Sequence, residues 1–131
     1  MHKTILILLL LGLCSSAAAD WVKLTGSGSD TDSYYADPTT KRKASNRVKI
    51  WSLVDHAKEL ADSFGKSHLS EKVQWEFDCT EEQKKMLAYT TYAENQGRGK
   101  AVYNDPTPGK WEAVPRGTIQ ESLWKFACGK K

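Results

Sequence analysis

An alternating run of apolar and polar residues is the feature that most limits how this chain can fold. Between Val73 and Asp78 the sequence reads Val-Gln-Trp-Glu-Phe-Asp, with a large apolar side chain at every second position. Successive side chains of a strand point to opposite faces, so this run predicts a strand with one buried and one solvated face. Strands of this kind are typical of antiparallel sheets, which often leave one face to water.

Similar patterns predict further strands along the chain. They are expected at residues 21–24, 33–36, 48–55, 83–92 and 100–104. The first two would form an opening hairpin, and the Gly-rich residues 95–99 would form the turn between the last two.

The connection between residues 55 and 72 breaks the alternation. Its apolar residues have the spacing of a helical face and are followed by Gly65: Ala57, Leu60, Ala61 and Phe64. That spacing favours one or two helical turns, and the alternative is an irregular loop.

The C-terminal segment has the pattern of an amphipathic helix. Thr118 with Glu121 three residues later forms a capping box, and Gly129 is placed as a C-cap. One arc of the helix is apolar, and it contains Ile119, Leu123, Trp124, Phe126 and Ala127. We therefore predict an α+β domain: an antiparallel sheet of about six strands with a helix from Thr118 to Cys128 packed on one face.

The start of the chain, residues 1–19, is expected to be a cleaved signal peptide, which leaves a single domain at residues 20–131. A short positive segment precedes an apolar run that ends at Leu13, and three alanines then supply the cleavage site. A stable membrane span would need about 20 apolar residues. Lipid attachment at Cys14 would need a small residue before it, where this chain has Leu13. The predicted product is exported, periplasmic or outer-membrane and extracellular, without a lipid anchor.

Cleavage would leave two cysteines, Cys79 and Cys128. An even cysteine count in an exported chain predicts a disulfide, and these two residues allow one pairing. The bridge would attach the last turn of the predicted helix to the end of the 73–78 strand. Neither cysteine belongs to a CxxC or Cys/His spacing, so a metal site at this pair is not expected.

Composition and motifs exclude several classes of function. The net charge of +3 over 131 residues lacks the concentrated basicity of a nucleic-acid-binding protein. The sequence contains no nucleophile elbow, paired-histidine zinc motif or phosphate loop, so we predict no enzyme, no cofactor and no metal. Glu76 and Asp78 lie on one side of their predicted strand and could form the acid–base pair of a small hydrolase. Solvated strand positions explain both carboxylates equally well, and we assign no catalytic residue.

The histidines of the predicted domain are His56 and His68. With Glu59 and Asp62 near them, they could form an adventitious metal site. Because both histidines lie in a polar connection that does little to fix their geometry, we expect solvated surface residues instead.

The densest group of charges is basic and consists of Lys41, Arg42, Lys43, Arg47 and Lys49. This group could bind an anionic polysaccharide, a lipid headgroup or an acidic protein surface. The alternative is a solvated turn between two strands, where charges are common.

The tryptophans divide into two groups. Trp75 and Trp124 lie on predicted core faces, so packing explains them. Trp51 and Trp111 could be buried or could be exposed for recognition, because tryptophan is enriched at binding hot spots.

A series of landmarks follows in order along residues 20–131. They are Trp21–Leu24, Tyr34–Pro38, Val48–Trp51 with Asp55, Trp75–Cys79, Tyr92, Gly97 and Gly99, Trp111–Pro115, and a terminal helix that closes with Cys128. This order resembles the surface-adhesin protein E family of Gram-negative bacteria. The resemblance implies a small antiparallel sheet with a C-terminal helix tethered through Cys79 and Cys128. It also implies an outer-membrane lipoprotein that binds host matrix and plasma proteins, a pattern from which this chain departs by lacking an acceptable lipidation site.

The sequence leaves two functions open. The first is a non-enzymatic, exported bacterial envelope protein, an adhesin E-like binding module that contacts host matrix or plasma proteins. The second is a soluble periplasmic protein that binds or inhibits an envelope component and has no adhesive role. In both, the expected partner is a protein or an anionic envelope or matrix ligand, and nucleic acid is not involved.

Overall fold

The structure is a computed structural model that describes residues 20–25 and 32–131. The predicted signal peptide, residues 1–19, lies outside the described residues. The strands are β1 (Val22–Lys23), β2 (Ser33–Ala44), β3 (Arg47–Ala61), β4 (Ser67–Asp78), β5 (Gln83–Tyr92), β6 (Ala101–Asp105) and β7 (Glu112–Ala113). The 3₁₀ turn η1 (Asn95–Gly97) and the helix α1 (Ile119–Cys128) complete the described elements. Within these ranges, no helix is both long and apolar enough to cross a membrane.

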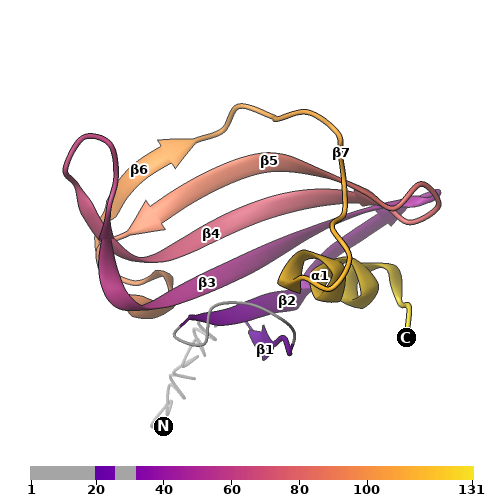
Figure 1. Cartoon of the computed structure of the whole chain (residues 1–131), viewed down its shortest axis with the longest axis horizontal. Helices are drawn as coiled ribbons and strands as arrows, with labels where there is room; N and C mark the ends of the chain where they lie inside the picture. Colours follow the sequence, from indigo (N-terminus) through magenta and orange to yellow (C-terminus); the bar gives the residue numbers. More distant parts are fainter. Residues whose placement is uncertain (1–19, 26–31) are drawn as a thin grey trace, which may run out of the picture.

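The strands form one antiparallel sheet in which β1 to β6 follow chain order (Figure 1). The two-residue strand β7 also pairs with β5. The sheet bends along its length, and α1 packs against β2, β3 and β4 (Figure 1). The predicted α+β fold, with about six strands and a C-terminal helix on one face, is confirmed.

The prediction of helical turns or an irregular loop at residues 57–64 is wrong. β3 continues to Ala61, and a short turn then leads into β4. The register of β3 against β4 is irregular between Asp55 and Leu60, and such a bulge breaks the alternation of side chains. The apolar spacing in this segment therefore does not mark a helical face. Its two largest side chains, Leu60 and Phe64, are exposed.

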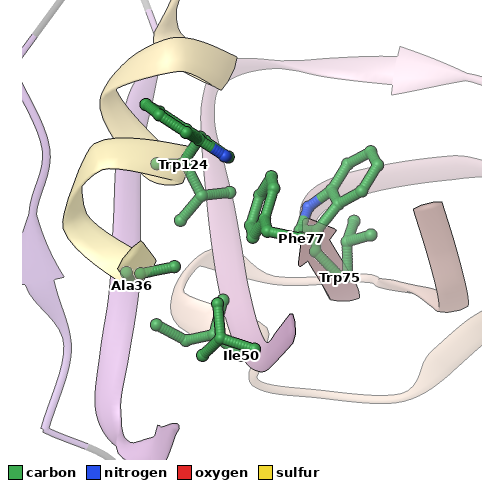
Figure 2. Close-up of a cluster of buried hydrophobic side chains, with 9 residues drawn as sticks. Ala36, Ile50, Trp75, Phe77 and Trp124 are labelled. Carbon is green, nitrogen blue, oxygen red and sulfur yellow. The ribbon is translucent and has the colours of Figure 1, made fainter. Parts of the chain in front are cut away.

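The core fills the space between the sheet and α1 (Figure 2). Its members are buried apolar residues of β2, β3, β4 and α1, namely Ala36, Val48, Ile50, Val73, Trp75, Phe77, Leu123, Trp124 and Ala127. The expected core positions of Trp75 and Trp124 are thus confirmed. Each fully buried large apolar side chain contributes about 1.5–3 kcal/mol. We call this side of the sheet the helix face, and the side reached by the intervening strand residues the far face.

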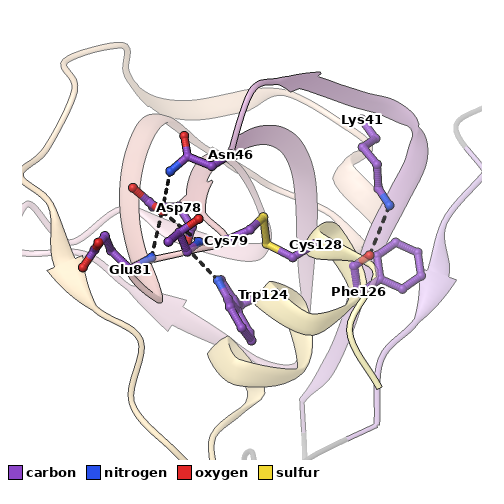
Figure 3. Close-up of a disulfide and its surroundings, with 9 residues drawn as sticks. Lys41, Asn46, Asp78, Cys79, Glu81, Trp124, Phe126 and Cys128 are labelled. Atoms are coloured by element: carbon purple, nitrogen blue, oxygen red, sulfur yellow. Dashed lines mark hydrogen bonds between the residues drawn. A yellow bond between two sulfur atoms is a disulfide. The ribbon is translucent and has the colours of Figure 1, made fainter.

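The predicted C-terminal helix is present with both caps. The Thr118 hydroxyl accepts a hydrogen bond from the Glu121 N–H at 3.4 Å, and Gly129 adopts a left-handed φ of 67° after the last turn. Cys128 is bonded to Cys79, which directly follows β4, with the two Cα atoms 5.6 Å apart (Figure 3). The predicted disulfide is therefore present, and it joins α1 to the β4–β5 turn.

Candidate functional site

A row of charged side chains crosses the far face of the sheet. Arg42 on β2 pairs with Lys49 on β3. Glu76 on β4 pairs with both Lys49 and Lys85. Directly paired residues point to the same face, so these side chains form one line across four strands. Lys49 alternates with core residues along β3, which places the line on the far face.

Trp111 lies against Lys85 of this row and against Arg47, two residues before Lys49 on β3. Its ring centroid is 4.9 Å from the guanidinium carbon of Arg47 and 5.7 Å from the ammonium nitrogen of Lys85. A backbone hydrogen bond of 2.8 Å from the Gly109 N–H to the Met86 carbonyl holds the preceding segment against β5. Cation–π contacts at exposed sites are worth about 0.5–1 kcal/mol each. Trp111, one of the two tryptophans whose exposure the sequence left open, is half-buried beside these cations.

Further aromatic rings line a groove on the same face. The groove has a volume of about 320 Å³, and its lining residues are Trp21, Asp37, Thr40, Trp51, Lys72 and Tyr92. The Lys72 ammonium nitrogen lies 5.2 Å from the Tyr92 ring centroid and 5.9 Å from that of Trp21. Trp51 is two residues from Lys49 along β3, so the groove adjoins the charged row. We call the combined surface the aromatic–cation face and define it as Trp21, Trp51, Tyr92, Trp111, Arg42, Arg47, Lys49, Lys72 and Lys85.

The basic run singled out in the sequence is divided between the two faces of the sheet. Arg42, Arg47 and Lys49 belong to the aromatic–cation face. Lys43 pairs with a core residue of β3 and so points to the helix face. Lys41 points toward α1, where its ammonium group donates to a backbone carbonyl of the helix at 3.2 Å (Figure 3). The interpretation of the run as a solvated turn is wrong, because its first three residues lie within β2 and its last two, Arg47 and Lys49, lie within β3.

Sequence reasoning missed Trp21, Lys72 and Lys85 as members of this surface. These residues are far apart in the chain. Strand register brings Lys72 and Lys85 to this face, and Trp21, which precedes β1, lies against Lys72. The sequence did contain a signal for Lys72. This lysine directly precedes the core residue Val73, and neighbouring residues of a strand point to opposite faces, so Lys72 lies on the solvated side.

Glu76 and Asp78 occupy alternate positions of β4, and Asp78 is engaged in structural hydrogen bonds (Figure 3). Its carboxylate accepts from the backbone N–H groups of Glu81 at 2.9 Å and Thr80 at 3.0 Å, and from the Asn46 amide at 3.1 Å. The hydrogen bond from Glu81 is the main cause that lowers the pKa of Asp78. An ionised, hydrogen-bonded carboxylate of this kind closes a turn and is poorly suited to deliver a proton.

The two histidines are buried, so the prediction of solvated surface histidines is wrong. His56 is 6% exposed and His68 is 5% exposed. Asp32 Oδ2 lies 3.1 Å from His56 Nδ1. Glu71 Oε1 lies 2.9 Å from His68 Nε2 and 3.5 Å from His56 Nε2. The Tyr89 hydroxyl donates to the same oxygen at 2.8 Å. We call His56, His68 and Glu71 the histidine cluster.

Neither acidic residue expected near these histidines joins the cluster. Glu59 is exposed, and the Asp62 carboxylate closes the β3–β4 turn by accepting backbone N–H groups. Glu71 takes their place, with its carboxylate close to both rings at the irregular end of the β3–β4 pairing. Residues three apart on a regular strand point to opposite faces, so the sequence around His68 did not indicate this contact.

A pocket of about 230 Å³ adjoins the histidine cluster on the helix face. Its lining includes Glu71 and Tyr89 together with apolar side chains such as Leu24, Trp75, Met86 and Leu123. Burial, followed by the hydrogen bond to Glu71, raises the pKa of the Tyr89 hydroxyl. Tyr89 therefore remains a hydrogen-bond donor to Glu71 at neutral pH.

With this geometry in place, comparison with known proteins places the chain in a family. The sequence model of the family described as Surface-adhesin protein E matches residues 21–129. The chain belongs to the surface-adhesin protein E family. The resemblance noted in the sequence is thereby confirmed. A comparison with curated protein sequences finds no match.

Solved structures of protein E from Haemophilus influenzae have the same fold as this member of the surface-adhesin protein E family. Crystal form II of that protein is 14% identical, with a TM-score of 0.67 over 83% of this chain and 87% of that chain. A second structure is 15% identical, with a TM-score of 0.64 over 83% of each chain. Protein E from a non-typeable strain is 14% identical, with a TM-score of 0.64 over 88% of this chain and 79% of that chain. At these identities the likeness shows a shared fold and does not transfer binding residues.

Proposed function

We propose that this protein is a non-enzymatic, exported bacterial envelope protein whose aromatic–cation face contacts host matrix or plasma proteins. The observation that carries the proposal is the gathering of tryptophans and cationic side chains on one face of the sheet. Tryptophan, tyrosine and arginine are the residues most enriched among binding hot spots. Membership of a family of surface adhesins supports the same function.

The charges of this face favour a partner with an acidic surface. The row across β2 to β5 contains three cations, Arg42, Lys49 and Lys85, and one carboxylate, Glu76. An excess of positive charge raises the rate of encounter with an anionic surface and discriminates against basic partners. Binding through this face should therefore weaken as salt concentration rises.

A soluble periplasmic protein that binds or inhibits an envelope component is the second candidate function. The observation that favours it is Leu13 before Cys14, which does not suit lipid attachment. A chain without an anchor would have no covalent attachment to hold it on the outer surface of the cell.

Two measurements separate these functions. Intact cells are treated with protease, and the oxidised, processed protein is tested for capture of purified matrix and plasma proteins and of proteins from an envelope extract. Digestion of the protein on intact cells, together with binding to a matrix or plasma protein, is the result expected of an adhesin. Protection behind the outer membrane, with capture of an envelope component alone, would replace the adhesin proposal with the periplasmic one.

A further inference from the structure

We propose that the histidine cluster is a binding site for a divalent transition-metal ion, and that Zn²⁺ is the ion its donors suit best. His56, His68 and Glu71 each offer one ligand atom, and these atoms all lie within 4.8 Å of one another. Imidazole nitrogen and carboxylate oxygen are common zinc ligands, and two histidines with one glutamate form a set whose fourth position holds water. Hard cations such as Ca²⁺ and Mg²⁺ prefer oxygen ligands alone, so they suit this site less well.

The hydrogen bonding of His56 determines where its proton lies. Asp32 is an acceptor 3.1 Å from Nδ1, so Nδ1 carries the proton. In the neutral ring, Nε2 then has a free lone pair, and no described residue forms a hydrogen bond with it. Glu71 Oε1, which also bears lone pairs, faces this nitrogen at 3.5 Å. This oxygen already accepts from the Tyr89 hydroxyl at 2.8 Å and lies 2.9 Å from His68 Nε2, so the buried atom without a partner is His56 Nε2. A second proton on the ring or a metal ion would supply that partner.

Both distances from Glu71 Oε1 to the histidine nitrogens are near those of a shared ion. Zinc bonds of about 2.0–2.1 Å at tetrahedral angles place two ligand atoms about 3.3 Å apart. His56 Nε2 and Glu71 Oε1 are 3.5 Å apart, which is close to that spacing. His68 Nε2 is 2.9 Å from the same oxygen, and the ligand nitrogens of the two histidines lie within 4.8 Å of each other, so the His68 ring would have to move to admit the ion. The ion would then replace the proton that a direct His68–Glu71 hydrogen bond requires.

Two groups outside the cluster form hydrogen bonds with its ligands and orient them, as residues around known metal sites do. Asp32 holds the distal nitrogen of His56, and a carboxylate in this position orients the ring and raises its basicity as a ligand. Tyr89 donates to the Glu71 carboxylate and orients it. Because Glu71 also lines the apolar pocket on the helix face, water can reach the fourth coordination position from there.

The ion would join several parts of the chain at the irregular end of the sheet. His56 lies on β3 inside its register irregularity, and His68 and Glu71 lie on β4. Asp32 immediately precedes β2, and Tyr89 lies on β5. Binding to the folded state alone stabilises it in proportion to the logarithm of the ion concentration. The site lies apart from the aromatic–cation face, so its test is independent of the proposed adhesive function.

The test is a metal titration of the chain expressed in full, recovered from its exported fraction, purified without a histidine tag and stripped with a chelator. Titration calorimetry with ZnCl₂ should show one site, and Co²⁺ should give the strong visible absorption of a tetrahedral complex. His68→Gln and Glu71→Gln should each weaken Zn²⁺ binding at least about tenfold, and Asp32→Asn by about 10–100-fold. Glu59→Gln is the matched control, because this exposed carboxylate of β3 lies outside the cluster and its loss should leave the affinity unchanged.

Absence of stoichiometric Zn²⁺ binding to the wild-type chain, or a Co²⁺ spectrum like that of the aqueous ion, would overturn the proposal. Equal weakening in Glu59→Gln and in the cluster variants would do the same. If the cluster variants do not fold, nitrogen-detected NMR of the histidine rings in the wild-type chain decides the question. Zn²⁺ should shift Nε2 of His56 to a metal-bound position and leave Nδ1 protonated. Ring spectra that Zn²⁺ leaves unchanged would mean that a proton occupies the site.

Discussion

The indole N–H of Trp124 donates a hydrogen bond of 3.0 Å to the backbone carbonyl of Asp78 (Figure 3). Asp78 directly precedes Cys79, and Trp124 lies one turn before Cys128, so this contact and the disulfide hold the same two segments together. α1 has 10 residues. Isolated helices shorter than about 12–15 residues are marginal in water, so the helicity of α1 depends on docking to the sheet.

Loss of the disulfide should release α1 before it disturbs the sheet. Cys128→Ser should lower the free energy of unfolding by about 2–5 kcal/mol, because the bridge closes a long loop and restrains the unfolded chain. Urea denaturation measures this change, and limited proteolysis should cut the C-terminal segment first. In the oxidised wild-type protein, mass spectrometry should find a Cys79–Cys128 cross-link and no alkylated thiol. Alkylation of both cysteines without reductant would contradict the tethered-helix fold.

The Trp124 hydrogen bond should contribute separately from the disulfide. Trp124→Phe leaves the buried Asp78 carbonyl without its donor, and this should lower the free energy of unfolding by about 1–3 kcal/mol. The matched control is Trp111→Phe, which alters a half-buried ring on the far face and should have a smaller effect. Equal losses in the two variants, measured by urea denaturation, would remove the special role of the Trp124 contact.

The C-terminal part of the fold was predictable because its determinants are local. Thr118, Glu121 and Gly129 specify the helix ends within a few residues of the helix itself, and the structure has both caps. The histidine cluster was not predictable, because it depends on a strand irregularity that lets His56 approach Glu71. The burial of both histidines follows from that approach and not from the polar sequence around them.

The aromatic–cation face was likewise predictable only in the part that depends on local sequence. Charge density along the sequence identified Lys41 and Lys43, yet Lys43 pairs with a core residue and the Lys41 ammonium group donates to α1, so both lie away from this face. Lys85 of β5 belongs to the face because it pairs directly with Glu76 of the neighbouring strand β4. A contiguous run of charge in a strand is divided between two faces by the alternation of side chains, and the register then assembles the surface from distant residues.

Asp78 should make the stability of the protein depend on acidic pH. Its pKa is lowered in the folded state, chiefly by the Glu81 N–H, so its contribution is fully present above the unfolded-state pKa of about 3.9. That contribution is lost as pH falls through the lower folded-state value. Asp78→Asn should therefore reduce stability at neutral pH and flatten its decline in acid. Urea denaturation across this pH range tests the prediction, with Glu59→Gln as an exposed control. If the free energy of unfolding of Asp78→Asn falls with pH as steeply as that of the wild type, Asp78 is not the source of this pH dependence.

Processing should remove the first 19 residues. The intact mass of the exported protein should correspond to a chain that begins at Asp20 and carries no lipid. Ala19→Leu places a large residue at the cleavage position and should leave uncleaved precursor in the cell. A mature chain with a lipid on Cys14 would contradict the prediction and would favour a surface-anchored adhesin.

The central claim is that the aromatic–cation face binds the partner, and a comparison of surface variants tests it most directly. Surface plasmon resonance against the matrix or plasma protein captured by the wild type should show that Trp111→Ala and Arg47→Glu each weaken binding about tenfold or more. Lys130→Glu, an exposed charge reversal beyond the end of α1, should bind like the wild type. Wild-type affinity in both Trp111→Ala and Arg47→Glu, with folding verified by circular dichroism, would contradict the claim.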